Sequence, residues 1–143
     1  MKKLLMLVAL VAIGYQVQAQ KLSAAQVPVA VKTTFKAKFP TVRTNTWEKE
    51  NGDFEAGFTL NGATMSAVIT PTGELKETET DMAVAKLPAA VRATLARDFK
   101  TAKITEAATL VSGAGAVTYE AEVQQGGKSH DVVFNADGTV LKK

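Results

Sequence analysis

Three consecutive residues, Ser129, His130 and Asp131, carry the side-chain types of a hydrolase triad. A triad works only where the imidazole lies between the hydroxyl and the carboxylate, so that it contacts both. Successive side chains on a strand point to opposite faces of the sheet, which would turn His130 away from both neighbours. We therefore interpret His130 as a structural histidine or one at the rim of the sheet, and we predict no catalytic residue.

Three carboxylates, Glu77, Glu79 and Asp81, recur at every second position and would share one side of a strand. Calcium needs several oxygen ligands that surround the ion, and an extended row does not surround it. The row favours a charged strand edge that resists pairing between sheets; weak metal binding by the same row is the alternative. The Asn-Ala-Asp-Gly segment at 135–138 resembles half of a calcium loop, but it lacks the remaining acidic ligands, so we interpret it as a hairpin turn. We predict no metal site.

Glu55 and Glu120 occupy matching positions in two similar stretches, and paired carboxylates can perform acid–base catalysis. Each alternates with apolar residues on an expected strand, which places it on the sheet face turned away from the core. Their duplication favours a surface role over a single active site. The glycines in 113–115 and 126–127 do not lead from a strand into a helix, so they do not predict a phosphate site. We predict neither enzyme activity nor a cofactor.

Trp47 allows two interpretations. It either packs in the core under a helix or serves as an exposed aromatic anchor, because Trp is enriched among interface hot spots. Alternation along the strands gives the anchor its neighbours on the solvent-facing sides. These are Thr59, Thr64, Ser66, Val68, Glu120, Glu122, Asp131 and Val133. The residues predicted to bind a partner are Trp47, Glu55, Thr59, Ser66, Val68, Glu120, Glu122 and Asp131.

Two helices are expected to position these strands. Apolar residues recur every fourth position, which places them on one face of a helix. The first set is Val27, Val31, Phe35 and Phe39, and the second is Leu87, Val91, Leu95 and Phe99. Pro28 suits a first helical turn, and Pro40 ends the first helix because its ring disfavours helical backbone at the preceding residue.

Strands are expected wherever apolar and polar residues alternate between turn residues. The clearest case is 54–60, where Phe54, Ala56 and Phe58 alternate with more polar or smaller residues. The expected strands are 44–50, 54–60, 63–69, 74–80, 104–111, 117–123, 129–134 and 139–142. The segment 20–26 is expected to be a lead-in, in which Ser23 and Gln26 have the spacing of a capping box.

The order of residue types from Val27 to Leu75 is repeated from Leu87 to Val140. Pro88 follows Pro28 by 60 residues, and Glu120 follows Glu55 by 65. A repeat at this spacing indicates one supersecondary unit used twice. We therefore predict an α+β protein of two tandem α-β4 units, 27–81 and 82–143, each with one helix packed on a four-stranded antiparallel meander. The two sheets are expected to lie side by side, with their uncovered faces forming one surface.

The N-terminus has the pattern of a signal peptide. Lys2 and Lys3 precede the apolar run 4–14, and Val17 and Ala19 place small residues at the cleavage positions. The run is shorter than a bilayer requires, so no membrane insertion is expected after the signal is removed. We predict a signal peptide at 1–19, cleavage near Ala19–Gln20 and a periplasmic or secreted protein.

Composition further limits the classes of partner that the chain is expected to bind. The 124 residues after the predicted cleavage carry 15 basic and 14 acidic side chains, and no basic stripe with interleaved aromatics. A nearly neutral chain without such a stripe is not expected to bind nucleic acid. The sequence has no Cys, which excludes disulfides and thiolate metal sites, so an apolar core must stabilise the fold.

The order of these residues resembles the PepSY-like domains that are similar to β-lactamase inhibitor proteins. The first copy reads Val27-Pro28, Phe35, Phe39-Pro40, Trp47, Phe54-Glu55, Gly62 and Gly73; the second reads Leu87-Pro88, Phe99, Tyr119-Glu120, Gly127 and Asp137-Gly138. The resemblance covers essentially the whole chain after the predicted cleavage at Ala19–Gln20. The second copy departs from the first at two positions, with Lys100 in place of Pro40 and Ala107 near the position of Trp47. We therefore expect the second copy to lack part of the surface that Trp47 supports in the first.

The resemblance implies a tandem repeat in the periplasm that binds another protein. Inhibition of an envelope hydrolase is one form of such binding. Together with the residues, the resemblance leads us to expect an exported, non-enzymatic protein that recognises a protein or peptide through its open sheet face. The alternative is a carrier of a small apolar ligand held between helices and sheets. The sequence does not predict the oligomeric state.

Overall fold

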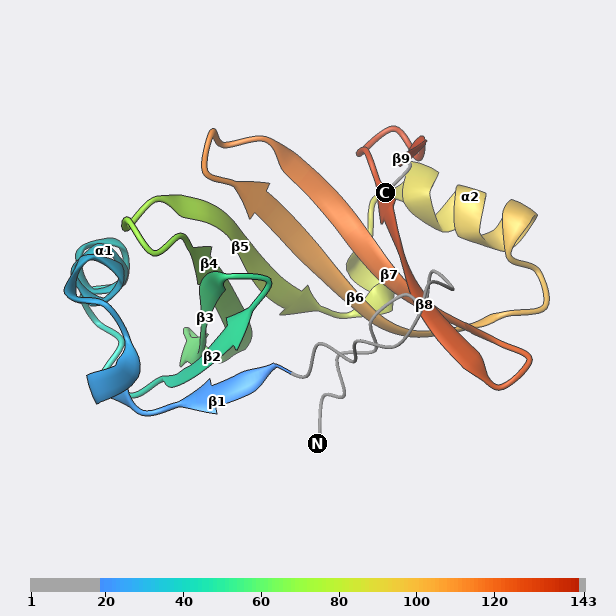
Figure 1. Ribbon diagram of the computed structural model, residues 1–143. Helices are drawn as coiled ribbons and strands as arrows, with labels where there is room; N and C mark the ends of the chain where they lie inside the picture. Colours follow the sequence, from blue (N-terminus) through green and yellow to red (C-terminus); the bar gives the residue numbers. More distant parts are fainter. Residues whose placement is uncertain (1–18, 142–143) are drawn as a thin grey trace. The chain divides into compact units, whose positions relative to one another are not determined.

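The computed structural model describes residues 19–141, so the predicted signal peptide lies, apart from Ala19, outside the described residues. The fold is α+β (Figure 1). The elements in chain order are β1 (Gln20–Leu22), the 3₁₀ turn η1 (Ala24–Gln26), α1 (Val29–Lys38), β2 (Thr46–Glu50), β3 (Asp53–Leu60), β4 (Ala63–Ile69), β5 (Leu75–Met82), the 3₁₀ turn η2 (Val84–Lys86), α2 (Ala89–Asp98), β6 (Lys103–Ser112), β7 (Val117–Gln125), β8 (Lys128–Phe134) and β9 (Val140–Leu141).

The strands are hydrogen-bonded in sequence order, from β1 to β9, as one antiparallel sheet. The two sheets that were expected to lie side by side are therefore one continuous sheet. A physical reason lies at the end of β6, where the Gly113 N–H donates a 2.7 Å hydrogen bond to the Lys76 carbonyl oxygen at the start of β5. Backbone groups that would otherwise need water are paired there.

The described residues divide into two compact units. The α1 unit contains 19–81 and 109–117, and the α2 unit contains 82–108 and 118–141. The C-terminal end of β6 therefore belongs to the α1 unit, while the rest of that strand belongs to the α2 unit.

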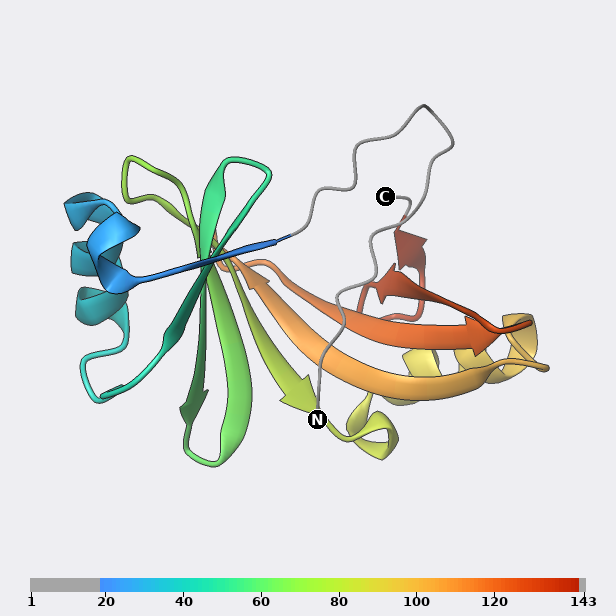
Figure 2. The same ribbon diagram turned by 60° about the horizontal axis from the view of Figure 1, so that its bottom comes forward.

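In the α1 unit, helix α1 lies across one face of the strands β2 to β5 (Figure 2). Pro28 precedes the first helical residue, and Phe39 ends the helix by donating its N–H to the Phe35 carbonyl. The inward side chains Val31 and Phe35 are 0% and 6% exposed. The buried core of this unit is Val27, Val31, Phe35, Trp47, Phe54, Ala56, Phe58, Ala67 and Ile69. Burying each large apolar side chain contributes about 1.5–3 kcal/mol.

Aromatic rings fill the layer between α1 and its sheet. The Phe35 ring centroid lies 5.2 Å from that of Phe58 and 5.4 Å from that of Trp47, both in edge-to-face geometry. Phe39 lies 4.6 Å from Phe58. These are the separations at which aromatic pairs attract one another beyond their area burial.

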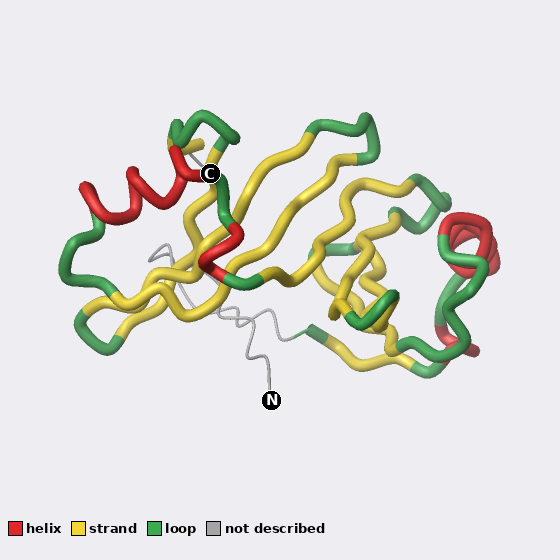
Figure 3. Tube along the Cα trace, turned by 180° about the vertical axis from the view of Figure 1, so that it is seen from behind, coloured by secondary structure: helices red, strands yellow, loops and turns green. Residues whose placement is uncertain are grey.

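In the α2 unit, α2 packs its own apolar side against β6 to β8; the helix is red and the strands are yellow in Figure 3. The buried core is Leu87, Val91, Leu95, Ala107, Ala121, Val123, Val132 and Phe134. Both expected helices are confirmed, although each begins two residues later than its first apolar residue, after the proline. The prolines provide extended backbone before the first helical turn.

The eight expected strands are all present, but the lead-in also contains a strand. Residues Gln20–Leu22 form β1, in which Leu22 pairs with Trp47 and packs against the core of the α1 unit. Three residues are too few to show a period, so the sequence did not predict this strand. The predicted capping box is confirmed, because the Ser23 N–H donates to the Gln26 Oε1 at 2.9 Å.

Within residues 19–141, none of the helices has the length and apolar character needed to cross a membrane.

Candidate functional site

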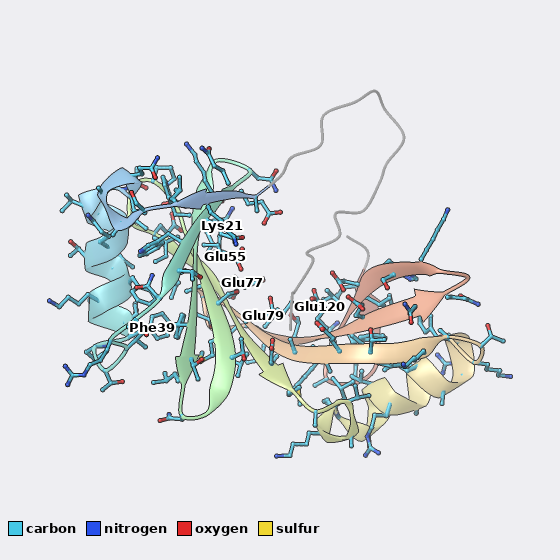
Figure 4. All side chains as sticks on the ribbon, turned by 90° about the horizontal axis from the view of Figure 1, so that it is seen from below. Lys21, Phe39, Glu55, Glu77, Glu79 and Glu120 are labelled. Atoms are coloured by element: carbon cyan, nitrogen blue, oxygen red, sulfur yellow. The ribbon has the colours of Figure 1, made fainter. Side chains whose placement is uncertain are left out.

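The α1 unit presents a polar sheet face on the side opposite α1, here called the distal face. One row of directly paired positions crosses it from β1 to β5. The row is Lys21, Glu48, Glu55, Val68 and Glu77. Figure 4 shows Lys21, Glu55, Glu77 and Glu79 on this side of the strands, whereas Phe39 lies on the side of α1. Directly paired side chains have Cβ atoms about 4.5–5.5 Å apart, so this row is one continuous strip.

Small hydroxyl residues continue the distal face beside the carboxylates. A second row runs through Thr46, Gly57, Ser66 and Glu79, and Thr59 pairs with Thr64 in the next row. Gly57 leaves room for its neighbour, because a Cβ there would lie 2.8 Å from the Thr46 Oγ1. Hydroxyls both donate and accept hydrogen bonds, so this part of the face can accommodate an extended backbone or polar side chains.

Charge is segregated within the α1 unit. Residues 20–47, which include α1, carry five basic side chains and no acidic one. Residues 48–81 carry eight acidic and two basic side chains. Glu48 and Glu55 stand directly opposite each other, an arrangement of like charges that is normally destabilising in a sheet. The distal face is thus mainly acidic, with Lys21 as a basic member of its first row, whereas the charged residues of α1 are all lysines.

One of these carboxylates, that of Asp53, takes part in an ion pair at the surface. The Lys76 Nζ lies 2.7 Å from the Asp53 Oδ2, and this hydrogen bond, together with the attraction between the two charges, raises the pKa of Lys76. The lysine is half exposed, so this pair is a minor contribution to stability.

The α2 unit also carries carboxylates on the face opposite its helix. Glu122 pairs with Asp131, and Glu120 pairs with Val133. The Thr105 hydroxyl donates to the Glu122 carboxylate. Val133 was expected to face solvent, but it is 5% exposed, and that expectation is wrong. Burying its branched apolar side chain away from water lowers the free energy of the folded state.

Trp47 lies in the core, so the exposed-anchor hypothesis is wrong. It is 6% exposed, pairs with Ala56 and packs on Phe35. The signal was present in the sequence: Thr46, Glu48 and Glu50 share the opposite side of β2, so Trp47 occupies the apolar side with α1. Trp47 cannot contact a partner directly.

The other predicted binding residues fall into two groups. The distal face brings together Glu55, Thr59, Ser66 and Val68, of which Thr59 is exposed and the rest are half-buried. Glu120, Glu122 and Asp131 belong to the α2 unit. Sequence reasoning missed Lys21 and Glu48, which complete the first row of the distal face.

His130 does not form a triad with its neighbours. It pairs with Val123 on the α2 side, and its ring lies 6.4 Å from that of Phe99, whereas Ser129 and Asp131 pair with Gln124 and Glu122. The side chain is exposed. This is the rim position expected from strand alternation. Among the described residues, no group of three or more His, Asp or Glu side chains is arranged to hold a metal ion.

Three solved structures resemble this chain over most of its length. A protein assigned provisionally to the periplasm, from Bacteroides eggerthii, is 22% identical, with a TM-score of 0.73 over 81% of this chain and 86% of that one. A DUF2874 family protein from Bacteroides ovatus is 20% identical, with a TM-score of 0.73 over 82% and 86%. A BLIP-like protein from Bacteroides fragilis is 19% identical, with a TM-score of 0.67 over 81% and 84%.

No protein-family model matches the chain, and no curated protein matches it either. The structural likeness therefore establishes a BLIP-like fold and leaves the function to be argued from the residues.

Proposed function

We propose that this chain is an exported, non-enzymatic binding protein that recognises a basic segment of another protein through the distal face of its α1 unit. The observation that carries the proposal is the strip that contains Glu48, Glu55 and Glu77, in which Glu48 and Glu55 are directly paired and Val68 lies between Glu55 and Glu77, with hydroxyl residues beside it. Complementary potentials across an interface select the partner and accelerate association. The proposed partner therefore presents Lys or Arg side chains to this strip.

We also propose the finer architecture and location. The chain is proposed to contain two tandem α-β4 units of the PepSY-like type, after removal of a signal peptide at Ala19–Gln20. The repeat is supported by matching contacts: Thr34 and Gly73 make the same hydrogen bond as Thr94 and Gly138. The BLIP-like neighbour supports a role in protein recognition, for which inhibition of an envelope hydrolase is one form.

The packing of the α1 unit argues against the alternative of a carrier. A ligand held between α1 and its sheet would occupy the layer in which Phe35, Phe39, Trp47 and Phe58 make ring contacts at 4.6–5.4 Å. Opening that layer would break contacts that stabilise the core. The distal face, by contrast, is polar and needs no rearrangement of the core to contact a partner.

A charge reversal on the distal face tests the proposal. The chain from residue 20 is used as bait with envelope extract in three forms: unchanged, Glu48→Lys and Glu74→Lys. Both variants make the same charge change, but Glu48 is on the distal face, whereas Glu74 follows the turn that contacts α1. We expect a protein recovered by the unchanged bait and by Glu74→Lys, and lost with Glu48→Lys, because like charges across the interface repel.

The recovered protein should also be released by salt, since Coulomb attraction between exposed charges is screened at high ionic strength. Equal recovery with all three baits would reject the distal face as the binding surface. Recovery of no protein, together with a small molecule that co-purifies with the chain, would favour the carrier.

A further inference from the structure

Gln20 is the first residue of β1, and it is also the residue that follows the proposed cleavage site. The signal pattern and the first strand of the sheet thus meet at the same bond. The side chain of Gln20 is exposed, and the strand pairs it with Lys49. We propose that the exported chain is modified at this residue to an N-terminal pyroglutamate, an inference that rests on the proposed cleavage and goes beyond the proposed binding function.

The modification needs only the groups of Gln20 itself. The neutral α-amine attacks the side-chain amide carbon Cδ, a C–N bond forms in a five-membered lactam, and the amide C–N bond breaks. The leaving nitrogen takes one proton from the attacking amine and departs as ammonia, so no oxidant or co-reactant is required. An α-amino group has a pKa of about 7.7–8.0, which leaves a neutral, reactive fraction near pH 7.

The lactam changes the charge at the start of β1. The register pairs Gln20 with Lys49, whose Nζ lies over the Phe54 ring, 5.4 Å from its centroid. An uncyclised chain would carry an ammonium group at Gln20, next to Lys21. Cyclisation removes this positive charge and keeps an N–H donor at the same atom.

Strand β1 pairs with β2, so the chemical state of its first residue affects how stably this end of the sheet is held. Leu22 pairs with Trp47 and packs against the core of the α1 unit, although β1 has only three residues. N-terminal strands fray unless pairing ties them down. A neutral, blocked terminus leaves no charge at the first residue of this short strand and resists aminopeptidases.

The test uses the full chain of 143 residues, expressed in a bacterium that exports it and recovered from the envelope fraction. Intact mass spectrometry and Edman degradation are applied to the recovered protein and to Gln20→Asn. Asparagine retains the amide, but its shorter side chain would need a strained four-membered lactam. We expect the unchanged chain to be lighter than its Gln20-first sequence by one ammonia, to resist Edman degradation, and to be read from Lys21 after treatment with pyroglutamyl aminopeptidase.

The Asn variant should have its full mass and an open N-terminus. A recovered chain that begins with Gln20 and has a free amine would overturn the modification. A chain that begins at another residue, or keeps residues 1–19, would overturn the cleavage and the modification with it. Neither result bears on the bait experiment with Glu48→Lys, so failure here is distinguishable from failure of the binding proposal.

Discussion

The Thr94 hydroxyl donates a 2.9 Å hydrogen bond to the Gly138 carbonyl oxygen, which joins the middle of α2 to the turn before β9. Thr94 is 5% exposed and is the one buried polar residue in the described core. The α1 unit contains the same relationship, in which the Thr34 hydroxyl donates to the Gly73 carbonyl at 2.6 Å. Each bond fixes a helix to a turn of its own sheet.

Substitution of Thr94 by Val should destabilise the protein. Valine has nearly the same shape but no hydroxyl, so the Gly138 carbonyl loses its donor. We expect the free energy of unfolding to fall by about 1–3 kcal/mol, the cost of an unsatisfied buried group. Urea unfolding measures the change. Thr94→Ser retains the hydroxyl and serves as the control; equal stability of the Val and Ser variants would show that the bond contributes nothing.

Substitution of Gly138 by Ala should cost more than the same change at Gly127. Both glycines have positive φ, 86° and 76°, so an alanine at either position is strained by about 1–2 kcal/mol. Only at Gly138 would the new Cβ also clash, 2.6 Å from the Ala90 carbonyl oxygen, whereas nothing lies within 4 Å at Gly127. We expect the free energy of unfolding to fall by about a further 1–3 kcal/mol in Gly138→Ala, as measured by urea unfolding. Equal stability of the Gly138→Ala and Gly127→Ala variants would mean that α2 moves away from the new Cβ without a loss of stability.

Trp47 should be shielded from water in the native protein. It is the single Trp in the sequence, so all tryptophan emission reports on this site. Because the ring is 6% exposed, we expect blue-shifted emission that iodide quenches weakly, and a red shift with full quenching on unfolding in urea. Free tryptophan is the control. Native emission quenched as strongly as the free amino acid would contradict the core position.

Asp137 should make the stability depend on acid pH. The Thr139 backbone N–H donates to its Oδ1 at 2.9 Å, and this bond lowers the pKa of Asp137 in the folded protein. A lowered folded pKa contributes stability above the unfolded value of about 3.9, and that contribution is lost as the pH falls through the folded pKa. Asp137→Asn cannot titrate at this position. The difference in unfolding free energy between the two proteins should therefore shrink between pH 7 and about pH 3; a constant difference would exclude the effect.

Much of the local structure could be predicted because it depends on residues close in the chain. The four-residue spacing from Val31 to Phe35 defines a helix face, and the alternation of Phe54, Ala56 and Phe58 defines a strand with one buried side. Both patterns follow from the periods of the backbone. The side of β2 on which Trp47 lies could have been read in the same way from Thr46, Glu48 and Glu50.

The distal face was decided by tertiary structure. Glu48, Glu55 and Glu77 lie on three different strands, and they form one strip only because the register aligns β2 to β5. A shift of one residue in any pairing would turn a strand's polar side chains toward α1. Likewise, β1 pairs with β2 through Gln20, Lys21 and Leu22, and the hydrogen bond from Gly113 to Lys76 joins residues that are 37 positions apart. Composition and period determine which residues avoid water, whereas register between distant segments determines which residues meet.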